Sequence, residues 1–302
     1  MSDQDELQAL LQKTSRTFAL TIPLLPQPIR QEVGVSYLLF RIIDTFEDAT
    51  AWSSDRKTAA LAEFVRLMDE SDPSRVRAAA ARWIEEPPLD HAGYLELLAR
   101  TPEVLQWQRA LRPEARDQIR RHLTRTAQGM SEFVVCANGT GMLRLETMQD
   151  LRDYCFAVAG IVGQMLTELY LLSSPKLASV ADDLRERAVS FGEGLQLVNI
   201  LKDAQPDAAE GRVYLPRQLT LAEVFLLARH DLETALEYTE ILRSAEADFG
   251  IVAFNALNAR LALATLRVLS DQGLGSKLTR LQLTGLAVDV MRSIKAGAPL
   301  FP

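Results

Sequence analysis

A cluster of carboxylates, Asp44-Thr45-Phe46-Glu47-Asp48, follows an apolar stretch that covers residues 37–43. Side chains three and four positions apart share one face of a helix, so Asp44, Glu47 and Asp48 are expected to project together. Clustered carboxylates on a buried helix repel one another and are costly to remove from water. Mg²⁺ would offset that cost, because it prefers oxygen ligands. A single such cluster is more simply a solvated acidic face, so a magnesium site needs a second observation.

A second polar cluster supplies that observation, within the apolar stretch Leu195–Leu201 and the Lys202-Asp203 that follows it. Asn199, Asp203 and Asp207 are spaced four residues apart and would form one stripe on a helix. Amide and carboxylate oxygens together suit Mg²⁺. Pro206 should kink or end the helix, which places Asp207 on its last turn or just beyond it. Two such clusters predict a helical cavity in which cations connect acidic walls to a diphosphate.

Basic residues near both clusters fit an anionic substrate. Arginine binds two phosphate oxygens at once through its planar donors. Taken alone, each of these residues is more simply explained as a surface charge or as a member of an ion pair within a helix. The candidates are Arg16, Arg41, Lys202 and Arg212.

The segment Tyr154–Gly163 is apolar and carries small residues, among them Gly160 and Gly163. Glycine inside a helix costs stability relative to alanine, so it needs a reason. Close packing of two helices is one interpretation, and room for a long isoprenoid chain is the other. Tyr154, flanked by apolar residues, should have a shielded hydroxyl that needs a polar partner.

Helical periodicity dominates the chain, and few stretches alternate apolar and polar residues with the period of a strand. The sequence therefore predicts an all-α fold, a helical bundle around an apolar cavity, as a single domain over residues 1–302 without strands. The expected helices cover residues 3–13, 28–51, 56–70, 75–85, 91–99, 102–110, 114–138, 147–173, 178–205, 219–228, 231–271 and 276–296.

Composition excludes several classes of function. The net charge of −7 argues against a nucleic-acid partner, which needs a basic face. Two cysteines and three scattered histidines give no zinc spacing and no disulfide framework. The acidic start MSDQDELQ is unlike a signal peptide, and no apolar run reaches the length of a membrane span. A cytoplasmic protein without a transmembrane segment is expected.

Taken together, these residues resemble the squalene/phytoene synthase family, the head-to-head prenyl transferases. The resemblance extends from about residue 15 to about residue 269. It is carried by SRTF at 15–18, DTFED at 44–48, YCFAVAGIVG at 154–163, and LQLVNILKDAQPD at 195–207 with GRVYLP after it.

The resemblance implies an isoprenoid-synthase fold and a Mg²⁺-dependent farnesyl transferase acting on farnesyl diphosphate. It implies that Asp44, Glu47 and Asp48 bind Mg²⁺-diphosphate from one wall, and Asn199, Asp203 and Asp207 from the other. Asp44, Asp48 and Asp203 would thereby serve catalysis, together with Tyr154 near the reacting carbons. The positions expected to contact substrate are Arg16, Phe18, Arg41, Gly160, Gln196, Lys202 and Arg212.

Within the family, the sequence resembles squalene synthases more than plant-type phytoene synthases, because residues 254–266 are similar to the late helix of squalene synthases. This implies reduction by NADPH to squalene, with Phe254 and Asn255 near the reductant. Asn258-Ala259 stand where eukaryotic relatives have Pro-Gln, and Lys202 where many relatives have arginine. The alternatives are a synthase of dehydrosqualene, phytoene or presqualene diphosphate without reduction, a terpene cyclase, and a non-catalytic relative. A transient contact with a membrane surface could release the product.

Overall fold

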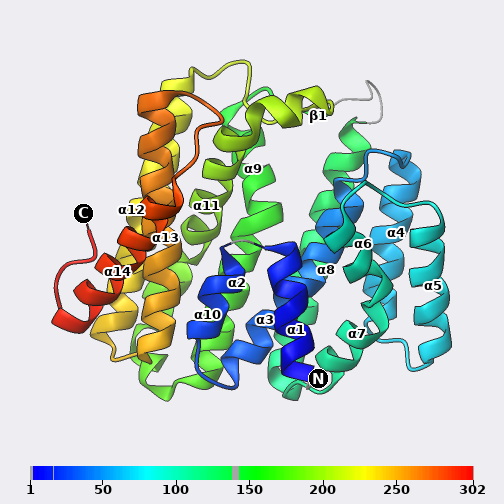
Figure 1. Ribbon diagram of the computed structural model, residues 1–302, viewed down its shortest axis with the longest axis horizontal. Helices are drawn as coiled ribbons and strands as arrows, with labels where there is room; N and C mark the ends of the chain where they lie inside the picture. The colour runs from blue at the N-terminus through cyan, green and yellow to red at the C-terminus, as the bar shows by residue number, and fades with distance from the viewer. Residues whose placement is uncertain (1–2, 16, 138–142, 302) are drawn as a thin grey trace. The chain divides into compact units, whose positions relative to one another are not determined.

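The computed structural model describes residues 3–15, 17–137 and 143–301 and is almost entirely helical (Figure 1). Its contacts group into two compact units. The first contains residues 1–23 and 27–138, and the second contains residues 24–26 and 139–302. The predicted all-α class is confirmed, whereas the single domain stays a prediction.

The first unit is built around α3, which contacts α1, α4, α6, α7 and α8. An aromatic cluster fixes the carboxyl-terminal end of α3, since the Phe46 ring lies 4.7 Å from Trp83 and 5.6 Å from Trp52. The helices of this unit are α1 (Asp3–Thr14), α2 (Phe18–Thr21), α3 (Ile29–Glu47), α4 (Ser54–Leu67), α5 (Pro73–Glu85), α6 (Ala92–Ala99), α7 (Thr101–Arg109) and α8 (Pro113–Ala137), with the 3₁₀ turn η1 (Ile22–Leu24) at its boundary.

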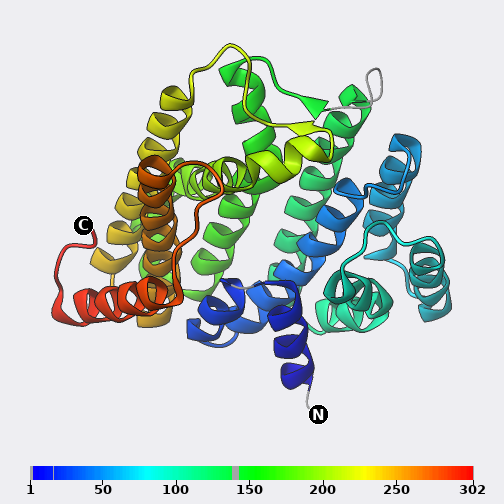
Figure 2. The ribbon, with the colours of Figure 1, turned by 45° about the horizontal axis from the view of Figure 1, so that its top comes forward.

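In the second unit, α11 lies among α10, α12 and α13 (Figures 1 and 2). Its elements are β1 (Leu143–Arg144), α9 (Met148–Cys155), the π-helical turn η2 (Phe156–Gly160), α10 (Ile161–Ser173), the 3₁₀ turn η3 (Pro175–Val180), α11 (Ala181–Ala209), β2 (Arg212–Val213), α12 (Leu221–Ser244), α13 (Phe249–Gln272) and α14 (Arg280–Ala296).

The structure corrects three predictions about these elements. The expected break near residues 229–230 is wrong, because α12 continues to Ser244 and the turn falls at 245–248. There Glu246 takes a positive φ of 54° and the Asp248 side chain caps α13. Two very short parallel strands, β1 and β2, also pair, with Leu143 opposite Arg212. Finally, Pro206 does not end α11, which runs three residues further.

Two helical stretches, Met148–Ser173 and Phe249–Gln272, are long and apolar enough to span a membrane by length and composition. In the structure, 56% and 72% of their most apolar windows are buried against other helices. Core helices of a soluble domain pass the same test, so these two stretches are weak support for a span.

Candidate functional site

The first acidic cluster, Asp44, Glu47 and Asp48, lies at the carboxyl-terminal end of α3. Asp48 caps this helix and its backbone N–H donates to the Asp44 carbonyl at 2.8 Å. Asp44 and Asp48 are partly exposed, whereas Glu47 is only 6% exposed. The two aspartates are therefore the accessible oxygen ligands of this cluster.

Arg41 lies one turn before Asp44, between two tyrosine rings. Its guanidinium carbon is 5.5 Å from the centre of the Tyr37 ring and 5.4 Å from that of Tyr94 on α6. One of its nitrogens is 3.4 Å from Asp44 Oδ2, and two others donate to the Tyr37 hydroxyl at 3.3 Å. Phe18 packs against Tyr37, with 5.5 Å between ring centres. The structure thus brings together Phe18, Arg41 and Asp44, and adds Tyr37 and Tyr94 to them.

Local electrostatics favour a cation beside Asp44. Burial raises the pKa of Asp44 to about 6, and Asp48 raises it further, while Arg41 opposes the shift. The negative end of the α3 dipole also lies here; its own last turn contains no basic residue, and Lys57 Nζ donates to the Glu47 carbonyl at 2.8 Å. A divalent cation would lower the energy of these charged carboxylates.

Tyr94 was not found from the sequence, and its contact with Arg41 gives a first prediction. Tyr94→Leu removes one face of the cation–π sandwich, so binding of Mg²⁺-diphosphate should weaken about 2- to 20-fold. Tyr94→Phe keeps the ring and should bind as the unchanged protein does. Titration calorimetry with inorganic diphosphate and Mg²⁺ measures both. Equal affinities for the leucine and phenylalanine variants would show that the ring does not position Arg41.

The second cluster, Asn199, Asp203 and Asp207, lies near the carboxyl-terminal end of α11. Lys202 Nζ donates to Asn199 Oδ1 at 2.8 Å and lies 3.2 Å from Asp203 Oδ2. The oxygens of Asn199 and Asp203 therefore reach one cationic atom. Asp203 Oδ2 belongs to a side chain that is 42% exposed. These two residues can present oxygens to a common cation, and their role as magnesium ligands stays a prediction.

Asp207 follows on the last turns of α11, because the helix continues past Pro206. Its Oδ1 is 3.2 Å from Arg212 Nη2, which also donates to Glu210 at 2.7 Å. Arg212 begins β2, so the pairing of β2 with β1 places this guanidinium beside the acidic end of α11. The structure brings Arg212 to Asp207, and the phosphate-binding role of Arg212 stays a prediction.

Both clusters fit Mg²⁺ in donor chemistry. Among the described residues, no three His, Cys, Asp or Glu side chains form a ready metal cage. Magnesium typically takes one or two carboxylates and completes its shell with waters and substrate phosphates. Each cluster also lies at the negative end of a helix whose last turn lacks a basic residue. The residues present therefore suit magnesium that arrives with a diphosphate.

Tyr154, at the end of α9, is 3% exposed, as the apolar flanks predicted. Its ring stacks on that of Tyr214, with 4.6 Å between centres and 27° between planes. Tyr214 directly follows β2, so the short sheet positions this pair. Tyr214 belongs to the motif GRVYLP, but the spacing of residues in the sequence did not indicate that it contacts Tyr154.

The glycines after Tyr154 serve close helix packing. A Cβ at Gly163 would lie 2.0 Å from the Ala188 carbonyl oxygen, and one at Gly192 would lie 2.0 Å from the Ala159 oxygen. At Gly160 the nearest atoms belong to Phe156 and Val189, at 3.0 and 3.1 Å. The backbones of η2, α10 and α11 thus approach each other at these glycines. This geometry favours the packing interpretation over room for substrate at Gly160.

A buried charge cluster lies beside these glycines. Arg152 Nη1 is 3.0 Å from Glu193 Oε2, and Nη2 is 3.7 Å from Asp231 Oδ1. Both carboxylates are at most 4% exposed. Burial raises the pKa of Glu193 to about 7, and Asp231 raises it further, while Arg152 opposes the shift. Burial likewise raises the pKa of Asp231.

This cluster predicts a pH-dependent stability. The pKa of Glu193 is raised from its ordinary value of 4.5 to about 7 in the folded protein. Protonated Glu193 therefore stabilises the fold fully below pH 4.5, and this stabilisation is lost as the pH rises to about 7. Glu193→Gln removes the titration, so its unfolding free energy relative to the unchanged protein should increase between pH 5 and 8 by about 1–3 kcal/mol. Urea unfolding at both pH values measures it, with the exposed Glu186→Gln as control. A pH-independent difference would mean that Glu193 stays ionised.

Other predicted residues lie apart from these contacts. Arg16 lies outside the described residues, and Gln196 is half-buried on α11. Phe254 and Asn255 are each 1% exposed in the core of the second unit, where Asn255 donates to the Tyr170 hydroxyl at 3.3 Å. A reductant could not contact these two side chains without a rearrangement of the packing.

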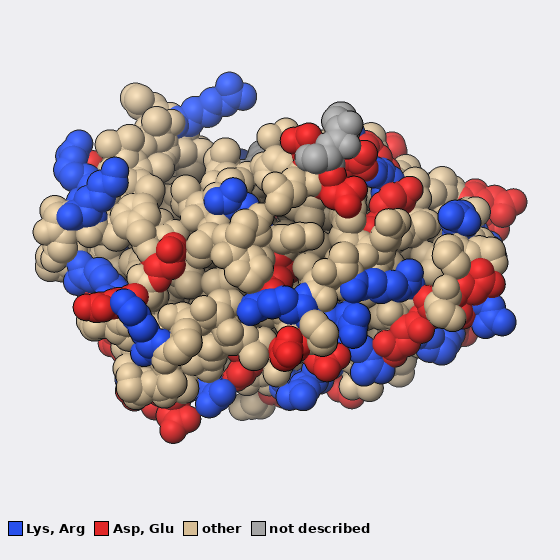
Figure 3. Space-filling model, turned by 90° about the horizontal axis from the view of Figure 1, so that it is seen from below, with Lys and Arg blue, Asp and Glu red and all other residues tan. Residues whose placement is uncertain are grey.

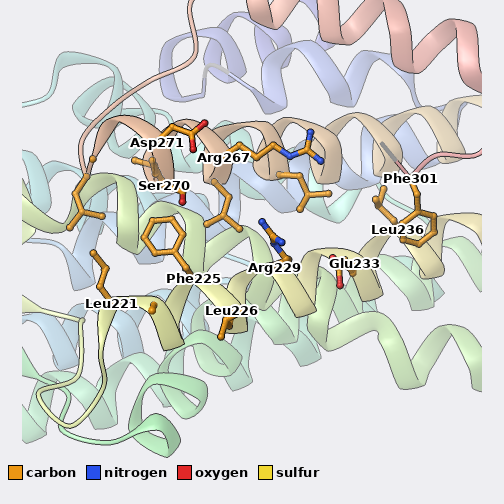
Figure 4. A pocket seen from close by; sticks show the side chains of 16 residues that line it. Leu221, Phe225, Leu226, Arg229, Glu233, Leu236, Arg267, Ser270, Asp271 and Phe301 are labelled. Atoms are coloured by element: carbon orange, nitrogen blue, oxygen red, sulfur yellow. The ribbon is translucent and has the colours of Figure 1, made fainter.

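The second unit also carries a groove of about 750 Å³ between α12 and α13 (Figure 4). Figure 4 shows Arg229 and Arg267 extending into it from the two helices, with Phe225 and Phe301 on its walls. It contains none of the predicted site residues. Over the face shown in Figure 3, basic and acidic side chains are interspersed along much of the surface, unlike a nucleic-acid-binding face.

Comparison with known proteins shows the family of this chain. The pattern of the squalene/phytoene synthase family matches residues 11–226, so the chain belongs to this family. It is 32% identical over 216 residues to the squalene synthase of Eremothecium gossypii, covering 70% of this chain and 45% of that protein. Squalene synthase 1 of Arabidopsis thaliana is 31% identical over 216 residues, with 70% and 47% covered. The chain thus spans about half the length of these curated relatives.

Solved structures agree in fold. A ligand complex of TcSQS superposes with a TM-score of 0.75 at 26% identity, covering 95% of this chain and 85% of that one. A dehydrosqualene synthase superposes with a TM-score of 0.62 at 18% identity, covering 97% of each chain, which shows a shared fold.

Proposed function

We propose that this protein is a squalene synthase. Two farnesyl diphosphates would condense head to head to presqualene diphosphate, with release of one diphosphate and one proton. Hydride transfer from NADPH, with release of the second diphosphate, would then give squalene. The observation that carries the proposal is the pair of acidic clusters inside the family-matched region, each with a basic residue against its carboxylates. A central apolar cavity for the two farnesyl chains, expected from the sequence, belongs to the proposal.

The chain's own residues have defined tasks in this scheme. Arg41, Lys202 and Arg212 would bind diphosphate oxygens, and the carboxylates of Asp44, Asp48 and Asp203 would hold magnesium. Magnesium bound there would stabilise the negative charge on the departing diphosphate. The stacked Tyr154 and Tyr214 rings present π-faces that stabilise a nearby allylic cation. Apolar walls exclude water that would quench the cation.

A synthase that stops before reduction, at presqualene diphosphate, dehydrosqualene or phytoene, is the second candidate. The burial of Phe254 and Asn255 favours it, because these were the residues expected near NADPH.

Product analysis separates the two candidates. Purified protein is incubated with farnesyl diphosphate and Mg²⁺, with and without NADPH, and the products are identified by mass spectrometry. Squalene formed only with NADPH is the expected result. A C30 hydrocarbon or diphosphate unaffected by NADPH would favour the second candidate, and a cyclic C15 product would exclude both.

The apolar product makes contact with a membrane surface useful for its release. Squalene carries no polar group, so release to a membrane surface avoids its exposure to water. We propose such a transient contact; the absence of a transmembrane segment and of a nucleic-acid partner, expected from the sequence, stays a prediction. The cytoplasmic location expected from the sequence stays a prediction.

A further inference from the structure

Positive charge is concentrated near the end of the chain. Residues 277–295 contain four basic side chains and one acidic side chain, a net charge of +3, in a chain whose net charge is −7. The rest of the chain therefore carries −10. The basic residues are Lys277, Arg280, Arg292 and Lys295, and the acidic residue is Asp289.

The same segment exposes apolar side chains. Leu281 is 83% exposed and Val288 is 51% exposed on α14. They are seven residues apart, so they lie on one stripe, which Arg292 and Lys295 continue. Val290, on the opposite side, is 1% exposed, because that side of α14 packs within the second unit. The outward face of α14 thus combines two apolar residues with two cations.

A hollow of about 670 Å³ lies along this outward face. Its lining is apolar except for Arg292 and Lys295. Arg292 is 3.4 Å from Asp289, but the two side chains are 75% and 63% exposed, so water and salt screen the pair. Both cations can therefore still attract an external anion. The lining residues are Ala287, Val288, Met291, Arg292, Lys295 and Ala296.

We propose that the outward face of α14 docks on the surface of an anionic lipid membrane. Basic side chains would bind lipid phosphates while Leu281 and Val288 enter the headgroup region. This inference depends on the proposed function in one respect only: the release of an apolar product is the reason for docking on a membrane. A second copy of the chain fits less well, because an isologous contact would bring the Arg292 and Lys295 side chains of both copies together. Nucleic acid would leave the exposed leucine and valine without a role.

Co-sedimentation with lipid vesicles tests this surface. The unchanged protein should bind vesicles containing phosphatidylglycerol about tenfold or more tightly than vesicles of phosphatidylcholine alone, and high salt should weaken that binding. The double variant Arg292→Glu/Lys295→Glu should lose this preference, and Leu281→Gln/Val288→Gln should weaken binding to both kinds of vesicle. Arg77→Glu/Arg121→Glu, at exposed positions on α5 and α8, is the charge-matched control and should bind normally.

Farnesyl diphosphate turnover in detergent, measured on the same variants, keeps the two proposals distinct. The α14 variants should keep turnover and melting temperature and lose only vesicle binding. Vesicle binding by the α14 variants equal to that of the unchanged protein would overturn the inference, as would an equal loss in the control. Dimers in solution that Leu281→Gln/Val288→Gln dissociates, without vesicle binding, would assign the face to a second copy instead.

Discussion

Asp44→Asn should lower kcat/KM for farnesyl diphosphate by about 10³-fold, equivalent to about 4 kcal/mol of transition-state stabilisation. Asparagine keeps the size of the side chain and one oxygen but removes the charge that binds magnesium. The fold should not suffer. Burial raises the pKa of Asp44 to about 6, so at neutral pH, where Asp44 is mostly ionised, its charge lowers the stability of the folded protein. The melting temperature of the variant at pH 7.5 should therefore be unchanged or higher.

The matched control is Asp117→Asn, an exposed carboxylate on α8 of the same unit. It should change kcat/KM less than about twofold, as surface substitutions usually do. The raised pKa of Asp44 adds a second readout, because protons compete with magnesium as the pH falls through about 6. The Mg²⁺ concentration for half-maximal turnover should rise in that range. Near-normal turnover by Asp44→Asn would remove the first cluster from the mechanism.

Asp203→Asn should cause a loss of similar size, about 10³-fold in kcat/KM. Asp203 Oδ2 and Asn199 Oδ1 reach the same cationic nitrogen of Lys202, so they can share one magnesium ion. The variant leaves this pair without a charged oxygen. Asp183→Asn, an exposed aspartate at the other end of α11, is the control and should retain turnover.

The double variant Asp44→Asn/Asp203→Asn shows whether the two clusters serve the same step. Residues that act on one step are not additive, so the double variant should be little slower than the slower single variant. Losses that multiply would indicate independent roles. A normal rate for Asp203→Asn alone would restrict the metal site to the first cluster.

The sequence predicted helices and ligands where local spacing determines them. The clusters at Asp44 and Asp203 lie on long helices, as periodicity indicated. The break between α12 and α13 was misplaced, because the turn at 245–248 contains neither glycine nor proline. The sequence feature that marks this turn is Asp248, whose side chain caps the start of α13.

Contacts between residues that lie far apart in the sequence could not be predicted from the spacing of residue types. Tyr94 lies 53 positions after Arg41 and Tyr214 lies 60 after Tyr154, yet their rings contact those residues. No periodic pattern connects such pairs. The role of Gly163 was likewise left open, since only the path of α11 shows the Ala188 carbonyl at that position.

The central claim is that magnesium connects this protein to the diphosphate of its substrate. Thermal unfolding of the unchanged protein tests it with Mg²⁺ alone, with an unreactive farnesyl thiodiphosphate alone, and with both. Because the cation binds protein and anion together, the melting temperature with both should rise by more than the sum of the separate shifts. Strictly additive shifts would contradict the account and leave the arginines as the sole diphosphate ligands.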